Sequence, residues 1–150
     1  MARKRKRGRP QRQRRRRQQQ RQQYEELDKY PVLPPHAFAR IVRDLRSLNI
    51  IYQIIEPPLT KKEEESRREI FDIFIKSLTA SIDEIDADPA VYLRTAMDKI
   101  IKSYGMKVSK KSKSKIFYYL RRDLIGYGRM DVMMNDPNVE DVSCDGTDVP

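Results

Sequence analysis

The chain has 150 residues, of which 38% are hydrophobic and 36% charged, and its formal net charge is +10. This length suits one domain with a modest core. No apolar run approaches the roughly 20 residues of a membrane-spanning helix. The basic N-terminus is not followed by the apolar segment of a signal peptide. Cys144 is the single cysteine, which excludes an internal disulfide. We therefore expect a protein of the reducing cytoplasm.

The positive charge is concentrated at the N-terminus. Residues 1–23 hold 12 of the 32 lysines and arginines and no acidic residue, so residues 24–150 carry 20 basic and 22 acidic side chains. Such a segment cannot bury enough apolar surface to offset its chain entropy, and its like charges repel. We predict a disordered tail that binds polyanions, whether nucleic acid, an anionic lipid surface or an acidic protein. The arginines expected to make these contacts are Arg5, Arg7, Arg9, Arg14, Arg15, Arg16 and Arg17.

One short motif in the tail favours DNA. The sequence Arg-Gly-Arg-Pro at residues 7–10 resembles the core of an AT-hook. In that motif the glycine lets the backbone approach the minor groove, and the arginines enter a narrow A·T tract. Four residues inside an arginine-rich run match by chance easily, so we favour a solvated basic arm with loose polyanion affinity. The AT-hook remains the alternative.

The next segments are expected to be a linker, a helix and a strand. Prolines at positions 31, 34 and 35 favour an extended linker over residues 24–36. Apolar residues at steps of three and four predict an amphipathic helix from Pro35 to about Leu48. The β-branched run at residues 50–55 predicts a buried strand that the following Glu-Pro-Pro ends.

Three further helices are expected, and two of them carry clear start signals. Thr60 and Glu63 form a capping box for a helix to about residue 78. Asp88 before Pro89 starts a second, to about residue 104, and Gly105 ends it. A third is expected over about 112–124, with Gly126 or Gly128 at its end, and alternation over 139–144 predicts a last strand.

These elements predict an α+β fold that is mostly helical, a helical bundle with two short strands. The predicted organisation is a disordered tail (1–23), a proline-containing linker (24–36) and one domain (37–150) whose last strand is incomplete.

Motifs for catalysis are missing. The sequence contains no Gly-x-x-x-x-Gly-Lys-Ser/Thr phosphate cradle, and the Gly126-Tyr127-Gly128 pair lacks the third glycine of a dinucleotide fingerprint. No base is identifiable beside Ser143 or Cys144. We predict no catalytic residue, no metal site and no cofactor of the chain's own, and therefore no independent enzyme.

Two stretches carry a resemblance to a known family. The sequences YYLRRDLIGYGRMD (118–131) and NDPNVEDVSCDG (135–146), with IIEPPLT (54–60) upstream, resemble the N-terminal domain of archaeal type II/IV secretion ATPases, the motors of archaella and type IV pili. The resemblance covers about residues 40–150. Val132 departs from it, since the family usually has proline there, and the RecA-like domain with its Walker A and B motifs is absent.

The resemblance implies a docking and regulatory domain that serves ATP-driven secretion or pilus assembly once joined to a RecA-like domain of the same or another chain. ATP and Mg²⁺ are implied only for the full-length family, and this chain should not hydrolyse ATP alone. The implied context is a ring bound to a membrane platform protein, peripheral to the inner face of the membrane.

Three arginines are the candidates for contacts beyond the domain. We hypothesise that Arg121, Arg122 or Arg129 reaches toward the nucleotide or the adjoining domain, because a guanidinium suits phosphate and carboxylate alike. Ordinary surface or ion-pair roles are the alternative. Two other functions also remain open: a nucleic-acid-binding accessory protein that acts through the tail, and a standalone regulator of a full-length ATPase.

Overall fold

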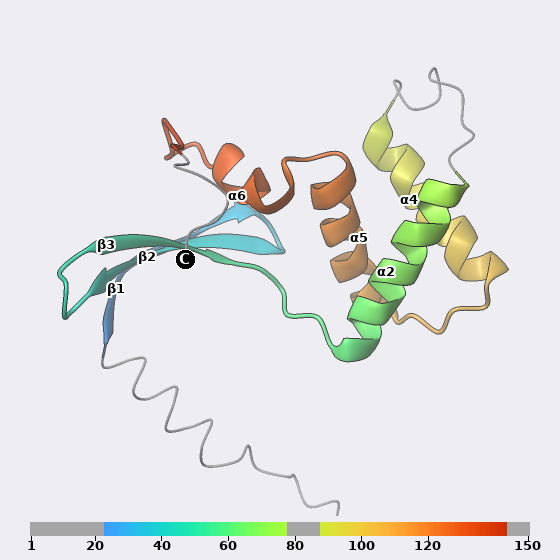
Figure 1. Ribbon diagram of the computed structural model, residues 1–150, viewed down its shortest axis with the longest axis horizontal. Helices are drawn as coiled ribbons and strands as arrows, with labels where there is room; N and C mark the ends of the chain where they lie inside the picture. The colour runs from blue at the N-terminus through green and yellow to red at the C-terminus, as the bar shows by residue number, and fades with distance from the viewer. Residues whose placement is uncertain (1–22, 78–87, 144–150) are drawn as a thin grey trace, which may run out of the picture.

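The computed structural model of the chain describes residues 23–77 and 88–143 (Figure 1). A three-stranded sheet lies at one end and three longer helices pack together at the other, with two short helical turns over the sheet. The predicted α+β class is therefore confirmed. The predicted disordered tail lies outside the described residues except for Gln23.

The sheet is antiparallel with the order β1-β2-β3. Its strands are β1 (Tyr24–Leu33), β2 (Ala37–Asp44) and β3 (Ile50–Ile55). The central strand β2 pairs on both sides, so that Ala39 lies opposite Tyr30 on β1 and Ile54 on β3. Two irregularities interrupt the pairing of β1, next to Leu27 and next to Val32.

Two predictions for this region are wrong. Residues 24–33 form an edge strand, where a linker was expected, and Pro31 is tolerated because an edge strand needs only one ladder of hydrogen bonds. Residues 37–44 form a strand, where a helix was expected. The steps of three and four were misleading, because Ala37 and Ala39 are fully buried on one face and the decisive period is two.

All three long helices were predicted, two of them from their start signals, and the third begins at residue 110, where about 112 was expected. They are α2 (Lys61–Lys76), α4 (Pro89–Ser103) and α5 (Lys110–Leu124). Both halves of the capping box between Thr60 and Glu63 are formed, and Asp88 caps α4 through the amides of the residues at 90 and 91. Gly105 follows α4 with a φ of 61°, the left-handed conformation expected of it.

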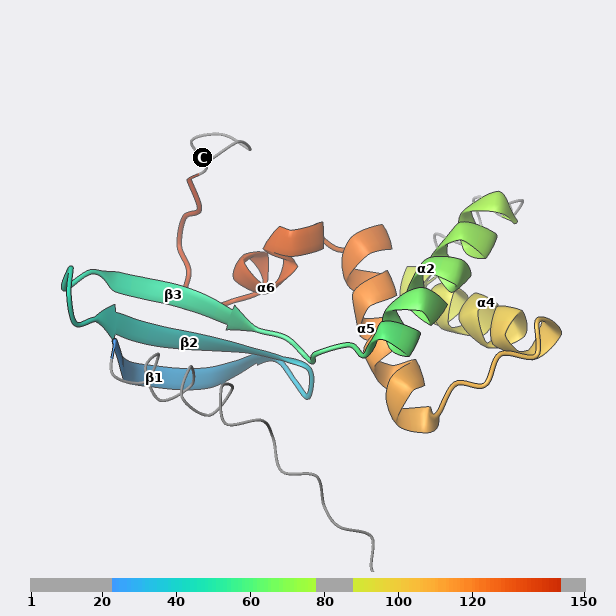
Figure 2. The ribbon, with the colours of Figure 1, turned by 60° about the horizontal axis from the view of Figure 1, so that its bottom comes forward.

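The helices α2, α4 and α5 enclose the main hydrophobic core (Figure 2). Its buried members are Ile70, Phe74, Leu93, Met97, Ile100, Ile101, Ile116 and Leu120. A second, smaller cluster joins Ala37 of the sheet to Tyr118 of α5 and to Val132. Helix α5 therefore belongs to both cores, with Ile116 and Leu120 on one side and Tyr118 on the other. A compact helical bundle is too simple a description, because one of its helices also covers the sheet.

The C-terminal part of the described chain crosses the sheet. It contains a 3-10 turn, η1 (Gly128–Met130), and a short helix, α6 (Asp131–Met134). The strand predicted over 139–144 is wrong for residues 139–143, which join no ladder. The amide of Val139 is instead used in a turn, where it donates to the carbonyl of Asp136. Cys144 lies outside the described residues.

None of the helices in the described ranges combines the length and the apolar character that crossing a membrane requires.

Candidate functional site

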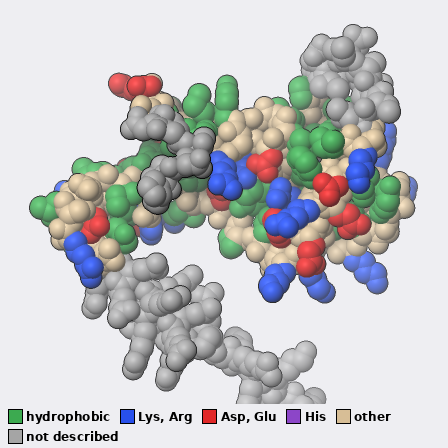
Figure 3. All heavy atoms as spheres, in the orientation of Figure 1, with side chains coloured by type: hydrophobic (Ala, Val, Ile, Leu, Met, Phe, Trp, Pro, Cys, Tyr) green, Lys and Arg blue, Asp and Glu red, His purple; other side chains and the backbone are tan. Residues whose placement is uncertain are grey.

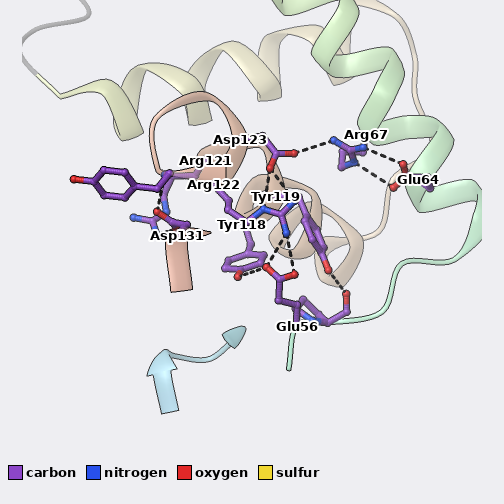
Figure 4. Close-up of polar contacts among 11 residues, drawn as sticks. Glu56, Glu64, Arg67, Tyr118, Tyr119, Arg121, Arg122, Asp123 and Asp131 are labelled. Carbon is purple, nitrogen blue, oxygen red and sulfur yellow. Dashed lines mark hydrogen bonds and ion pairs between the residues drawn. The ribbon is translucent and has the colours of Figure 1, made fainter. Parts of the chain in front are cut away.

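A polar junction connects the segment after β3 with helix α5 (Figure 4). Arg122 Nη1 donates to both carboxylate oxygens of Glu56, at 2.8 and 2.9 Å. The hydroxyl of Tyr118 donates to the same carboxylate at 2.7 Å. The hydroxyl of the next residue of α5, Tyr119, donates to the carbonyl of Pro57 at 2.9 Å. The extended segment that leaves the sheet is therefore fixed to α5 at two consecutive residues.

Arg122 is the central cation of this junction. Its side chain is 13% exposed, and its guanidinium lies over the ring of Tyr119 at 4.8 Å while Nε donates to Asp123 at 2.8 Å. Burial alone would lower the pKa of the Arg122 guanidinium, but the hydrogen bonds to Asp123 and Glu56 outweigh burial and raise it. Arg122 is thus a permanent, fully engaged charge.

Tyr118 is held as a neutral donor. Burial, and next the hydrogen bond that its hydroxyl gives to Glu56, raise the pKa of the Tyr118 phenol. Its ring lies beside that of His36, with ring centroids 5.3 Å apart. Tyr118 therefore positions the Glu56 carboxylate and stays protonated.

The junction continues to helix α2. Asp123 accepts from Arg67 Nη1 at 3.2 Å, and Arg67 in turn donates to Glu64 at 2.9 and 3.1 Å. The hydrogen bond to Glu64 raises the pKa of the Arg67 guanidinium, and the bond from Arg67 lowers the pKa of Glu64 to about 2. Acidic and basic side chains thus alternate along the junction, in the order Glu56, Arg122, Asp123, Arg67 and Glu64.

Asp131 forms a second polar centre, in the bend after α5. It is 2% exposed, and its carboxylate accepts from the amide of Tyr127 at 3.1 Å and from Asn135 Nδ2 at 3.3 Å. Gly126 lies directly against it, because a Cβ at this position would be 2.7 Å from Asp131 Cγ. The bend therefore closes around this carboxylate.

Asp136 forms a third centre, over the sheet. It is buried, and one carboxylate oxygen accepts from the hydroxyls of Tyr30 at 2.8 Å and Tyr52 at 2.6 Å. Burial would raise the pKa of Asp136, but the hydrogen bonds from Tyr52 and from the amide of Asn138 prevail and lower it. Residues of β1 and β3 are thereby joined through one carboxylate of the C-terminal segment.

The three predicted arginines have different surroundings. Arg122 is committed to the junction, and Arg121 contacts Asp131 at 3.5 Å with its side chain 36% exposed. Arg129 of η1 is exposed, and it makes no hydrogen bond or ion pair with any other described residue. Of the three, Arg129 is the one whose guanidinium is available to a partner. The tail arginines lie outside the described residues.

Several of the residues that build the site were not predicted to do so. The sequence predicts Glu56 only as the end of a strand, and it predicts no role for Asp131 and Asp136. Their only local signal is that all three lie inside the stretches that carry the family resemblance. Val132, where that resemblance departs from proline, is buried against Ala37 and Tyr118.

The polar groups of the junction are all paired with one another, as in a contact that stabilises the fold. Across the described ranges, every buried side-chain nitrogen and oxygen has a hydrogen-bond partner, and no group of three His, Cys, Asp or Glu side chains is arranged to hold a metal ion. The acids of the junction are paired with arginines or tyrosines, so none of these carboxylates is free to act as a base. These contacts hold the segment after β3 in place against α5.

Comparison with known proteins finds an archaeal relative. The chain is 33% identical over 100 residues to an uncharacterized protein of the archaeon Methanocaldococcus jannaschii. The alignment covers 66% of this chain and 40% of the relative, so the matched part is less than half of that protein. No family profile matches the sequence.

Proposed function

We propose that the chain is a docking domain of the secretion-ATPase type, which supports ATP-driven secretion or pilus assembly when combined with a RecA-like domain. One observation carries the proposal. Two of the stretches that resemble this family, 54–60 and 118–131, are far apart in sequence, yet they meet in the junction through Glu56 and Arg122. Residues shared with a family are expected to lie together when they serve one structural purpose.

The face expected to meet the RecA-like domain is the bend after α5. Ile125, Tyr127 and Met134 are exposed large hydrophobic residues there, and Arg129 stands exposed among them. Aromatic residues and arginine are typical anchors of protein interfaces. The internal contacts of Asp131 fix the backbone beneath these side chains, so the face is preorganised. ATP and Mg²⁺ belong to the partner in this proposal.

A reconstitution experiment tests it. The full chain is mixed with the purified RecA-like core of a secretion ATPase that lacks its own N-terminal domain, and complex formation is followed by sedimentation together with the ATPase rate. We expect a complex and a changed rate, and we expect Tyr127→Ala with Arg129→Ala to weaken both. Arg68→Ala is the matched control, because Arg68 is an exposed arginine on α2. If no complex forms at concentrations of tens of micromolar, the docking role is wrong.

The same mixture separates docking from regulation. A standalone regulator would bind a full-length ATPase and lower its rate by occupying the place of its N-terminal domain. A docking domain would restore a core that lacks that domain and leave the full-length enzyme unchanged.

The second candidate is a nucleic-acid-binding accessory protein, and it is favoured by the 12 basic residues of 1–23. Anisotropy of a labelled A·T-rich duplex over a range of salt concentrations tests it. Removal of residues 1–23 should abolish binding if the tail is the working part, and binding should fall steeply with salt. A duplex affinity that survives the truncation would contradict this candidate.

A further inference from the structure

The hairpin that joins β2 to β3 ends in exposed apolar side chains. Leu45 is 49% exposed, Leu48 69% and Ile50 66%, all within six residues of sequence. The hairpin lies at the end of the sheet farthest from the helices, where hydrophobic side chains are visible on the surface (Figure 3). We call these three residues the apolar tip.

Leu48 is held in an unfavourable backbone conformation. Its φ is 59°, in the left-handed region that glycine and asparagine adopt readily and that a leucine rarely adopts. Its amide donates to the carbonyl of Asp44 at 2.7 Å, so the turn itself enforces this conformation. An exposed leucine gains nothing from the core in return. Strain combined with exposure at a turn indicates that the side chain is needed for contact outside the fold.

The polar groups of the turn are used internally. The amide of Asp44 donates to the carbonyl of Asn49 at 2.9 Å, and the carboxylate of Asp44 accepts from the amide of Arg46 at 2.9 Å. The one acidic side chain of the turn is therefore occupied, while the side chain of Arg46 is exposed. The hairpin end presents three apolar side chains together with the exposed side chains of Arg46, Ser47 and Asn49.

The basic N-terminal segment joins the fold at this same end. The amide of Leu45 donates to the carbonyl of Gln23 at 2.9 Å, and Tyr24 lies opposite Asp44 in the sheet. All 12 basic residues of 1–23 precede Gln23 in the sequence. A polybasic segment and an exposed apolar hairpin thus begin at the same point of the molecule.

We propose that the apolar tip inserts into the surface of a membrane rich in anionic lipid, with the adjoining basic segment providing the electrostatic attraction. A peripheral protein usually needs two such signals, because neither a few apolar side chains nor a basic segment alone binds a bilayer stably. The inference rests on the hairpin and on the sequence that joins it, and it does not depend on the proposed docking function.

A bilayer fits the tip better than a nucleic acid does. A side chain that wedges into DNA enters one step between base pairs, so that one or two apolar residues suffice. Here Leu45 and Leu48 of the turn and Ile50 of β3 surround the hairpin end. The fluid interior of a bilayer can surround all three side chains at once, whereas a single base-pair step cannot. The same basic segment would also attract DNA, so the experiment includes a duplex.

The chain contains no tryptophan, which makes a single introduced tryptophan a clean reporter. Ile50→Trp places it at the tip, and Val91→Trp places it at a similarly exposed position on α4. Each full-length variant is mixed with vesicles of equal parts phosphatidylglycerol and phosphatidylcholine. We expect a blue shift and quenching by brominated acyl chains for Ile50→Trp and neither for Val91→Trp. No shift at the tip, or an equal shift at both sites, would overturn the proposal.

Leu48→Asn separates insertion from simple electrostatic attraction. Asparagine adopts the left-handed conformation, so the variant should fold with an unchanged or higher melting temperature. We expect its vesicle affinity to fall about tenfold, as for the withdrawal of one leucine from an apolar layer. High salt should weaken the binding of both proteins and leave the tenfold ratio between them, because it screens the shared basic segment and leaves apolar insertion intact. Unchanged affinity would refute insertion, and a blue shift of Ile50→Trp with an A·T-rich duplex but not with vesicles would assign the tip to DNA.

Discussion

Arg122 and Glu56 lie 66 residues apart in the sequence and form an ion pair, in which Arg122 Nη1 donates to both carboxylate oxygens at 2.8 and 2.9 Å. The pair fixes the exit of the sheet to the last turns of α5, and the phenol of Tyr118 completes it from the same helix. Neither partner is free to serve a ligand while the pair is closed. Arg122 was one of three candidates for an external contact, and its position makes it a residue of the fold.

Removal of one partner of this pair should be costly. Arg122→Met leaves Glu56 partly buried with only Tyr118 as a donor, and we expect a loss of about 3 kcal/mol of unfolding free energy. Urea unfolding followed by circular dichroism measures it. Glu56→Gln combined with Arg122→Met should cost less than the sum of the two single changes. Arg68→Ala, whose side chain is 71% exposed, is the control and should change stability by less than about 0.5 kcal/mol.

The two glycines of the bend should respond differently to alanine. At Gly126 a Cβ would overlap the buried Asp131 side chain and lie 3.1 Å from the carbonyl of Arg122, so we expect a loss of about 2–4 kcal/mol. At Gly128 nothing lies within 4 Å, and only the φ of 59° opposes a side chain. Gly128→Ala should cost about 1 kcal/mol. Thermal unfolding of both variants compares them, and equal losses would show that the packing around Asp131 does not govern the bend.

Acid should weaken the start of α2. The amide of Thr60, and then Lys115, hold the pKa of Glu63 at about 2, below its ordinary value of 4.5. A carboxyl whose pKa is lowered by folding stabilises the protein above the unfolded-state pKa, and this contribution is lost as the pH falls through the folded-state pKa. The melting temperatures of the wild type and Glu63→Gln should therefore differ at pH 7 and converge between about pH 4.5 and pH 2. A difference that stays constant over this range would contradict the assignment.

The tyrosine pair at Asp136 should act as a unit. Tyr52→Phe removes one of the two phenol donors to the buried carboxylate, and we expect a loss of about 1–2 kcal/mol. Tyr30→Phe in addition leaves that carboxylate oxygen without either phenol, so the double variant should lose more than the sum of the single losses. Tyr104→Phe, at an exposed tyrosine, is the control and should be neutral. Strict additivity in denaturant unfolding would argue against a shared carboxylate.

The local signals of the sequence predicted the helices well. Thr60 with Glu63, and Asp88 with Pro89, act within one turn of chain, so the start of α2 and of α4 can be identified without knowledge of their neighbours. The sheet depends on distant partners. Pro31 appeared incompatible with a strand until its edge position was known, and residues 37–44 satisfied a helical period as well as a strand period.

The site was predictable only in part, for the same reason. Arg122 stood out as an arginine of a distinctive stretch, but its partner Glu56 comes from another segment, and nothing local connects the two. Asp136 accepts hydrogen bonds from Tyr30 and Tyr52, which come from two different strands. A carboxylate that organises a tertiary contact looks in the sequence like any other carboxylate. Contacts over such separations become visible only in the folded chain.

Helix α5 faces two cores, with Ile116 and Leu120 toward α2 and α4 and with Tyr118 toward the sheet. It therefore connects the two halves of the molecule by packing against both. The ion pair between Glu56 and Arg122 ties the same two halves together a second time. A rotation of the sheet against the helices would therefore disturb both this pair and the packing of Tyr118.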